Sequence, residues 1–221
     1  MEAETRAGRA WLAGKQGKKA DASLEEALTR WKRLGRGSQK EMKASSRWAA
    51  EARYLQGESV FAQYQEIQLD VKPAALKSAL EKKKTLLARA QGIYTDVVSY
   101  GDPTWAVASL YRIGQIYEQF ADQLRKLPAP PGLTDEEQQV YREEVDRYVI
   151  DMEDKSAAIY EGGYRKALDL AVYGEATRKL RESLGRLAEN KFPPEREVRA
   201  RTRVGDKPPE AKLVLDVRRG E

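Results

Sequence analysis

The sequence predicts an all-α fold, and three observations support this prediction. The helix-favouring residues Ala, Leu, Glu, Lys and Arg are abundant in the 221-residue chain, whereas only three Phe occur. Charged residues make up 34% of the chain, above the roughly 25% of typical soluble domains, beside 41% hydrophobic residues. Apolar residues recur at positions i, i+3 or i+4, and i+7, so each helix is expected to have one buried and one solvated face.

Residues 1–36 are expected to form an N-terminal basic helical pair. The first helix spans residues 3–14, and the glycines and lysines of GKQGKKAD interrupt it. The second helix is expected to begin at an N-cap formed by Asp21 or Ser23 and to end at GRGS.

Residues 37–190 are expected to form the main helical domain, which begins with two long helices. The first starts at Ser38 and ends near Asp70, before a Lys-Pro pair. The second starts at Pro73, which suits the first turn of a helix, and Gly101 ends it. Three consecutive lysines on this second helix (82–84) are expected to lie on its solvated face.

The second half of this domain has clear start and stop signals. Asp102 is expected to cap the next helix, and the proline-rich segment 127–133 is expected to be a rigid loop. Thr134 then begins a long helix with acidic residues in its first turn. Gly162-Gly163 is expected to kink or split that helix, and Tyr173-Gly174 to separate it from a final helix, EATRKLRESLGRL. FPP stops the helical structure, and residues 191–221 are expected to form an extended or partly disordered tail.

The composition argues against catalysis. The chain has no Cys and no His, so it lacks thiolate chemistry, the usual general base and the commonest metal ligand. No motif for an activated nucleophile, a phosphate loop or a calcium loop is present. We therefore expect no enzyme activity, no cofactor and no metal site.

The net charge of +5 is unevenly distributed, with basic ends and an acidic middle. This charge distribution suggests the hypothesis that copies of the chain associate head to tail. The basic residues 1–50 also suggest an alternative function as a nucleic-acid-binding module, although a nucleic-acid-binding protein more often concentrates its Lys and Arg on one face. No segment approaches the about 20 apolar residues that cross a membrane.

One helical motif is informative about the fold. Leu110, Ile113, Gly114 and Tyr117 reproduce the first-helix pattern of the tetratricopeptide repeat, in which a glycine allows a neighbouring helix to approach the backbone. Residues 90–98 resemble the second-helix pattern of that family, although the period of about 34 residues is broken after this pair of helices. The chain thus resembles a divergent tetratricopeptide repeat (TPR) protein.

This resemblance implies an all-α, right-handed helical solenoid of TPR-like antiparallel helix pairs, with residues 37–190 as the repeat domain. More narrowly, GDPTWAVASLYRIGQIYEQFADQL, PAPPGLTDEE and GRLAENKFPPE resemble the C-terminal part of TPR proteins of bacterial gliding-motility and cell-envelope machinery. That resemblance implies a scaffold or adaptor with protein partners in the periplasm or cell envelope, and a signal peptide and further repeats upstream. The N-terminal residues lack the apolar core of a secretory signal, so the cytoplasm is the alternative.

The resemblance also implies a partner-binding surface on the inner face of the solenoid. Its repeat frame, carried over from Gly114, places five residues on that face: Ala108, Tyr111, Gln115, Glu118 and Gln119. Tyr111 is expected to stack on a partner side chain, and the two Gln to hydrogen-bond an extended peptide. The alternatives are that these residues form ordinary solvated surface, and that the chain is a purely structural helical bundle that oligomerises.

Overall fold

The structure is a computed structural model that describes residues 1–69, 71 and 73–193, and within them the chain forms only helices. The all-α prediction is therefore confirmed. Of the predicted tail at 191–221, residues 194–221 lie outside the described residues. The helices are α1 (Glu2–Ala13), α2 (Gly17–Gly35), α3 (Gln39–Glu66), α4 (Pro73–Ser99), α5 (Pro103–Arg125), α6 (Asp135–Asp169) and α7 (Glu175–Leu187).

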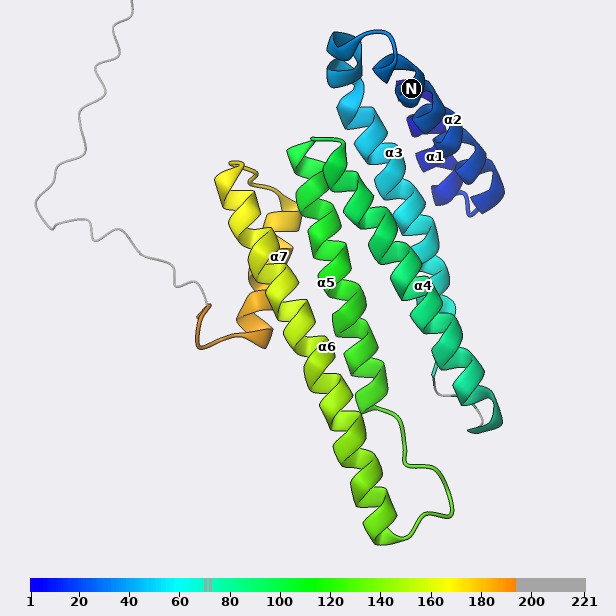
Figure 1. The fold of residues 1–221 in the computed structure, drawn as a ribbon, viewed down its shortest axis with the longest axis vertical. Coiled ribbons are helices and arrows are strands. Elements are labelled where there is room, and N and C mark those ends of the chain that lie inside the picture. Colours follow the sequence, from blue (N-terminus) through cyan, green and yellow to red (C-terminus); the bar gives the residue numbers. More distant parts are fainter. Residues whose placement is uncertain (70, 72, 194–221) are drawn as a thin grey trace, which may run out of the picture.

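The helices pack in chain order, and successive helices run antiparallel with connections at alternating ends (Figure 1). Each helix contacts the next one. In addition, α1 contacts α3, α3 contacts α5, and α5 contacts α7, whereas no two even-numbered helices approach one another within the described residues. The odd-numbered helices therefore form one continuous layer, and the even-numbered helices cover it from one side.

Three apolar clusters follow one another along the array. The first joins α2 and α3 through residues such as Leu24 and Ala52. The second and largest joins α3, α4 and α5 around Tyr64, and the third joins α5, α6 and α7 around Tyr160. The buried residues of each cluster come from three consecutive helices or fewer and the segments that connect them. The core therefore extends along the array and has no single centre.

Several predicted helix ends are confirmed, because local side chains satisfy their free backbone groups. The Asp102 side chain accepts a hydrogen bond from the Trp105 backbone N–H at 3.0 Å, with Pro103 in the first turn of α5. Thr134 and Glu137 form a reciprocal capping box at the start of α6. Gly101 adopts a φ of +78° before α5, a conformation that favours glycine.

The second helix begins earlier than predicted. The expected break in GKQGKKAD is limited to residues 14–16, where Lys15 has a φ of 55°, and α2 starts at Gly17 and not at an Asp21 or Ser23 cap. Ala20 is fully buried in the first turns of α2. Its backbone carbonyl lies near Gly8 of α1, so tertiary packing extends the helix through residues that favour a break.

Lys83 was expected on a solvated face, and this expectation is wrong. Its side chain is 0% exposed, and its ammonium donates hydrogen bonds to the carbonyls of Tyr64 (2.9 Å) and Ile67 (2.7 Å) at the end of α3. Because α3 ends there, neither carbonyl has the amide partner of a continuing α-helix. The Tyr64 carbonyl also accepts a 3.3 Å hydrogen bond from the Ile67 backbone N–H. Lys83 thus satisfies the C-terminus of α3, which ends at Glu66, before the predicted Asp70, while the chain turns so that Leu69 enters the core.

Gly162-Gly163 neither kinks nor splits the sixth helix, since α6 continues from Asp135 to Asp169. Gly163 is buried, and a Cβ there would lie 3.1 Å from both Leu110 of α5 and Leu180 of α7. The glycine therefore allows close packing of three helices. The predicted break at Tyr173-Gly174 and the final helix are both present as the start of α7.

Every pairing of an odd helix with the next even helix has the same contact. A glycine of the odd helix receives a large side chain of the even helix, so that a Cβ on the glycine would collide with it; at Gly114 the Cβ would lie 2.4 Å from the Tyr160 ring. Gly114 is buried, as close packing at this position requires. The three pairs are Gly8 with Leu24, Gly57 with Tyr94, and Gly114 with Tyr160.

Candidate functional site

The layer of odd-numbered helices has a free side opposite the even-numbered helices, and we call it the odd-helix surface. Two pockets open on this side. Neither is lined by a residue of an even-numbered helix, because one is formed by α1 and α3 and the other by α3, α5, α7 and the α6–α7 connection. Along α3 the two pockets are neighbours, since residues 47–51 line the first and Tyr54 lines the second.

The pocket between α3, α5 and α7, called the aromatic pocket, has a volume of about 360 Å³. The rings of Tyr54 and Trp105 meet in it with centroids 4.9 Å apart, and the Lys179 ammonium lies 5.8 Å from the Tyr111 ring centroid. Its walls are Tyr54, Thr104, Trp105, Ala108, Tyr111, Arg112, Val172, Gly174, Glu175, Ala176 and Lys179. The pocket thus combines flat apolar rings with two cations and one carboxylate.

Helix ends position two walls of this pocket. Trp105 lies in the first turn of α5, where the Asp102 cap fixes its backbone. The α6–α7 connection turns sharply at Ala171, which has a φ of 52°, and this turn directs the start of α7 against α5. The Thr177 hydroxyl donates a 2.7 Å hydrogen bond to the Val172 carbonyl and holds the connection to the first turn of α7.

A partly buried polar cluster supports the floor of the aromatic pocket. Arg112 of α5 donates to both carboxylate oxygens of Glu58 of α3, at 2.8 and 2.6 Å, and the Tyr94 hydroxyl of α4 donates to Glu58 at 2.5 Å. Burial alone would lower the pKa of Arg112, but its bonds to Glu58 raise that pKa above its ordinary value. Arg112 therefore stays charged, and three helices are fixed in register beneath the pocket.

The structure brings two of the five predicted site residues into the aromatic pocket. Ala108 and Tyr111 line it, and Tyr111 also stacks on Tyr160 of α6 with ring centroids 5.9 Å apart. The side chain of Tyr111 therefore has an intramolecular partner, and only part of it faces the pocket. Gln115 accepts a 2.5 Å hydrogen bond from Arg112, beside the pocket and not in its wall.

The other two predicted residues lie further along α5, outside the pocket. Glu118 accepts hydrogen bonds from the Tyr160 hydroxyl (2.6 Å) and from Arg186 of α7 (2.7 Å), so this carboxylate joins three helices. Burial raises the pKa of Tyr160, and the bond to Glu118 raises it further. Gln119 is half-buried on α5. Sequence reasoning placed these residues on one face of α5 but did not predict their contacts with α6 and α7, and their role in binding a partner stays a prediction.

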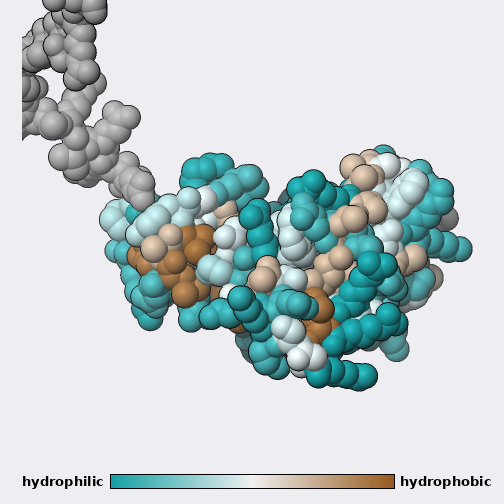
Figure 2. All heavy atoms as spheres, turned by 90° about the horizontal axis from the view of Figure 1, so that it is seen from above, coloured by the Kyte–Doolittle hydropathy of each residue, from teal (hydrophilic) through white to brown (hydrophobic). Residues whose placement is uncertain are grey.

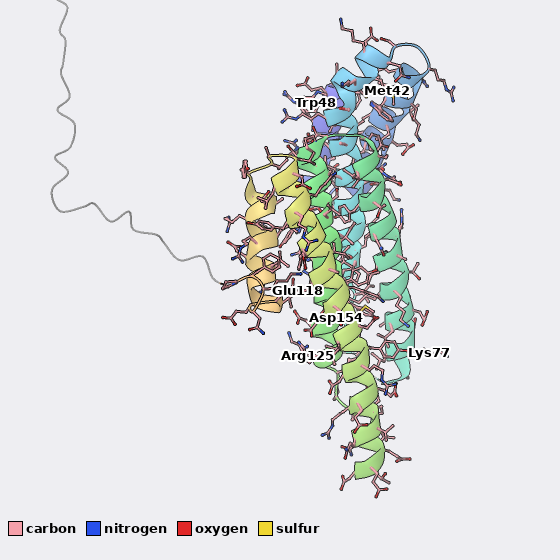
Figure 3. The ribbon with its side chains drawn as sticks, turned by 60° about the vertical axis from the view of Figure 1, so that its left-hand side comes forward. Met42, Trp48, Lys77, Glu118, Arg125 and Asp154 are labelled. Atoms are coloured by element: carbon pink, nitrogen blue, oxygen red, sulfur yellow. The ribbon has the colours of Figure 1, made fainter. Side chains whose placement is uncertain are left out.

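The pocket between α1 and α3, called the arginine hollow, was missed in the sequence. It has a volume of about 480 Å³, and Arg6, Arg9 and Arg47 surround Trp48 and Glu51. The guanidinium carbons of Arg6 and Arg47 lie 5.4 and 5.7 Å from the centroid of the Trp48 ring. Figure 3 shows Trp48 beside α1, with Glu118 near α7 and Lys77 projecting from α4 at the opposite edge.

A third hollow, between α6 and α7, is the largest of these pockets at about 800 Å³. Figure 2 shows brown surface at the left of the molecule, at the end where α6 and α7 meet, and Leu168 and Leu170 are exposed there. Tyr173 in the same connection is 77% exposed. This hollow lies at the end of the helical array and not on the odd-helix surface.

Within the described residues, no cluster of acidic side chains is arranged to hold a metal ion. None of the helices in that part of the chain is both long and apolar enough to cross a membrane. Comparisons with family models, with curated proteins and with solved structures give no significant match. The resemblance to TPR proteins therefore stays a prediction.

Proposed function

We propose that the protein is a non-catalytic scaffold or adaptor that binds another protein along its odd-helix surface. The observation that carries this proposal is the aromatic pocket, where Tyr54, Trp105 and Tyr111 from two helices converge with Arg112 and Lys179. Pockets of roughly 300–1,000 Å³ with apolar walls and a few placed polar groups are the usual form of a binding site. At about 360 Å³ the pocket suits one or two side chains of a partner.

The arrangement of the helices supports the same proposal. Contacts between successive odd helices, with even helices on one side only, are expected for a solenoid of antiparallel helix pairs, and solenoids use such a continuous layer as an extended binding surface. Aromatic and Arg side chains are also the residue types that dominate binding energy at protein interfaces. From the resemblance alone we infer a place in a larger cell-envelope or motility assembly, with the cytoplasm as the alternative location.

The proposal is tested by affinity capture with mass spectrometry, comparing the wild type with Tyr111→Ala plus Gln115→Ala. We expect specific proteins to be captured by the wild type and lost from the variant. The matched control is Tyr148→Ala plus Gln139→Ala on α6, because both side chains are exposed far from the pocket. Identical protein sets for all three forms would contradict the proposed surface.

A second variant separates lost binding from lost folding, since Tyr111 also packs on Tyr160. Ala108 is half-buried and lines the aromatic pocket, so Ala108→Arg fills the pocket from one wall without removing a packed side chain. Circular dichroism should show a helical content and melting temperature close to those of the wild type. Capture by this variant should nevertheless fall.

The arginine hollow favours a second candidate, a basic helical nucleic-acid-binding module that uses residues 1–50. Guanidinium groups stacked on Trp48 could contact phosphates or bases. A titration with duplex and single-stranded DNA at low salt tests this candidate, because phosphate contacts strengthen as salt falls. Absence of binding at low salt would remove it.

A further inference from the structure

The arginine hollow identifies the chemistry of the partner, an inference that rests on the proposed function. We propose that the odd-helix surface binds an extended acidic segment of another protein. A carboxylate side chain of that segment binds Arg6 and Arg47 in the arginine hollow. An apolar side chain nearby in the same segment enters the aromatic pocket.

The charges in the hollow are only partly compensated. Arg9 forms an ion pair with Glu51, which is 1% exposed. The two charges neutralise each other, so Arg9 contributes no excess positive charge to the hollow. Arg6 is paired with Glu2 in an exposed pair at 2.5 Å, a type that contributes little and exchanges readily with water. Among the described residues, no carboxylate lies within ion-pair distance of Arg47, whose contact is with the Trp48 ring. The hollow therefore has the excess positive charge that a carboxylate would neutralise.

Trp48 holds the two guanidinium groups in place. Both groups lie over its ring, which restricts their motion, and stacked guanidinium groups keep their hydrogen-bond donors free at the edge. An arginine donates two parallel hydrogen bonds to a carboxylate, and such charge-assisted bonds are among the strongest in proteins. Arg6 and Arg47 thus offer preorganised donors from two different helices.

Carboxylates on the same surface favour a peptide over a nucleic acid. Glu51 lies inside the hollow, and Glu175 lies in the wall of the aromatic pocket. A nucleic acid carries a phosphate at every nucleotide, and its affinity rises with the number of phosphates that Lys and Arg side chains neutralise. Isolated positive positions separated by acidic and aromatic side chains fit a peptide, which carries its negative charges at separated positions.

The distance between the two pockets determines how many positions separate the acidic and the apolar residue in the partner. Arg47 and Tyr54 lie two turns apart on α3, which corresponds to about 10 Å along the helix axis. An extended peptide advances about 3.3 Å per residue. The other walls of the two pockets lie on opposite sides of α3, on α1 and on α5 and α7, so this axial distance is a lower limit. The acidic and the apolar residue of the partner are therefore expected at least three positions apart.

Selection from a phage-displayed library of random peptides about 12 residues long, which would span about 40 Å when extended, tests this inference on the full chain. The wild type should enrich peptides with Asp or Glu three or more positions from an aromatic or large aliphatic residue. A selected peptide, synthesised with a fluorescent label, should bind at least about tenfold more weakly to Arg6→Gln plus Arg47→Gln. It should lose binding to Ala108→Arg.

Two controls complete the experiment. Arg142→Gln plus Arg147→Gln removes the same charge from exposed positions on α6 and should leave the affinity unchanged. Replacement of the acidic residue of the peptide by its amide should weaken wild-type binding about as much as the hollow variant does. The two losses should not add, because both changes remove the same contact.

The outcomes separate this inference from the proposed function. Enriched peptides without acidic residues, whose binding Ala108→Arg abolishes, would overturn the acidic-partner inference and leave the scaffold proposal standing. Failure of the wild type to enrich any peptide would contradict both. Tight binding of single-stranded oligothymidine that depends on Arg6 and Arg47 would overturn the inference in favour of a nucleic acid.

Discussion

Gly114 lies where the ring of Tyr160 packs directly on the backbone of α5. A Cβ at this position would lie 2.4 Å from the ring, and the ring cannot move freely because the Tyr160 hydroxyl is held by Glu118. We expect Gly114→Ala to lower the free energy of unfolding by up to about 2 kcal/mol, since overpacking costs about 1–3 kcal/mol and the gain in helix propensity offsets about 1. Urea denaturation measures this change.

Gly92 provides the matched control for this substitution. It also lies inside a helix, but no atom would lie within 4 Å of an added Cβ. Gly92→Ala should therefore raise the free energy of unfolding by about 0.5–1 kcal/mol through helix propensity alone. If both substitutions stabilise the protein, the close contact between α5 and α6 is not important for stability.

The buried Lys83 predicts that the free energy of unfolding depends on pH. Burial lowers the pKa of its ammonium to about 8 from an ordinary value of 10.5. Between pH 8 and about 10 the folded protein has released this proton while the unfolded chain retains it, so the free energy of unfolding rises with pH. The advantage of the wild type over Lys83→Met should be constant below pH 8 and then grow by up to about 1.4 kcal/mol per pH unit.

Denaturation of wild type and Lys83→Met between pH 6 and about 10, with the exposed Lys82→Met as control, checks this slope. A difference that stays flat across this range would mean that Lys83 is not desolvated as the structure indicates. Lys83→Met should also lower stability at neutral pH, because the carbonyls of Tyr64 and Ile67 lose their donor.

Gly114 and Lys83 also show how much the sequence can reveal about the environment of a single residue. The spacing of Leu110, Ile113, Gly114 and Tyr117 predicted close packing at Gly114, because a glycine inside a helix, with apolar neighbours one turn away, is typical of a position that a second helix approaches. Lys83 was predicted to be exposed, since a run of three lysines has no local property that distinguishes its middle residue. Its burial depends on the end of α3, which only the tertiary structure brings near it.

At the scale of helices, a polar contact repeats beside each close glycine contact. Each pair of successive odd helices is joined by one Arg and one Glu, and the charge order is reversed in the first pair. In the second and third pairs a Tyr of the intervening even helix donates to the same Glu. The Arg–Glu pairs are Arg9 with Glu51, Glu58 with Arg112, and Glu118 with Arg186.

A double-mutant cycle on Glu58 and Arg112 tests whether this contact fixes α3 against α5. Both side chains are 24% exposed, so the pair is screened less than a surface pair. With Glu58→Gln and Arg112→Gln we expect a coupling energy of about 1–2 kcal/mol. The exposed pair of Arg178 and Glu182 on α7 is the control and should give less than about 0.5 kcal/mol. Equal coupling in the two cycles would contradict the structural role of the Glu58 pair.

Helix ends were predictable only where the signal is local. The caps at Asp102 and Thr134 were correct, because a cap involves residues three positions apart in the sequence. The start of α2 and the uninterrupted α6 were missed, since in each case a residue that favours a break is held in the helix by packing. The packing contacts are those of Ala20 in α2 with α1, and of Gly163 in α6 with α5 and α7.

For the molecule as a whole, the helical array predicts a gradient of local stability. Within the part of the chain that the structure describes, helix α5 contacts four other helices, whereas α1 contacts only α2 and α3. Terminal elements with few neighbours open at lower free energy than central ones. Native-state hydrogen exchange should therefore be slowest at the buried backbone amides of α5 and markedly faster in α1. Equal exchange rates in both helices would indicate a single cooperative unit.

The sequence predicted the fold class and most of the elements, but only one part of the candidate site. Periodicity and composition are enough to identify helices. The repeat motif in 110–117 selected one face of α5, and two residues of that face, Ala108 and Tyr111, line the aromatic pocket. The arginine hollow needs α1 beside α3, and Arg6 and Arg47 lie far apart in the chain. Trp48 next to Arg47 is the local signal that could have pointed to it.

Site-specific photo-crosslinking tests the central claim, that partners bind on the odd-helix surface, most directly. A photoreactive amino acid is placed at an exposed position in the wall of each pocket, Ala13 in the arginine hollow or Thr104 in the aromatic pocket, where it removes none of the proposed contacts. The control position is Lys77 on α4, which projects from the opposite edge (Figure 3). We predict the same crosslinked partner from Ala13 and Thr104 and none from Lys77. A partner captured from Lys77 but from neither odd-helix position would contradict the claim.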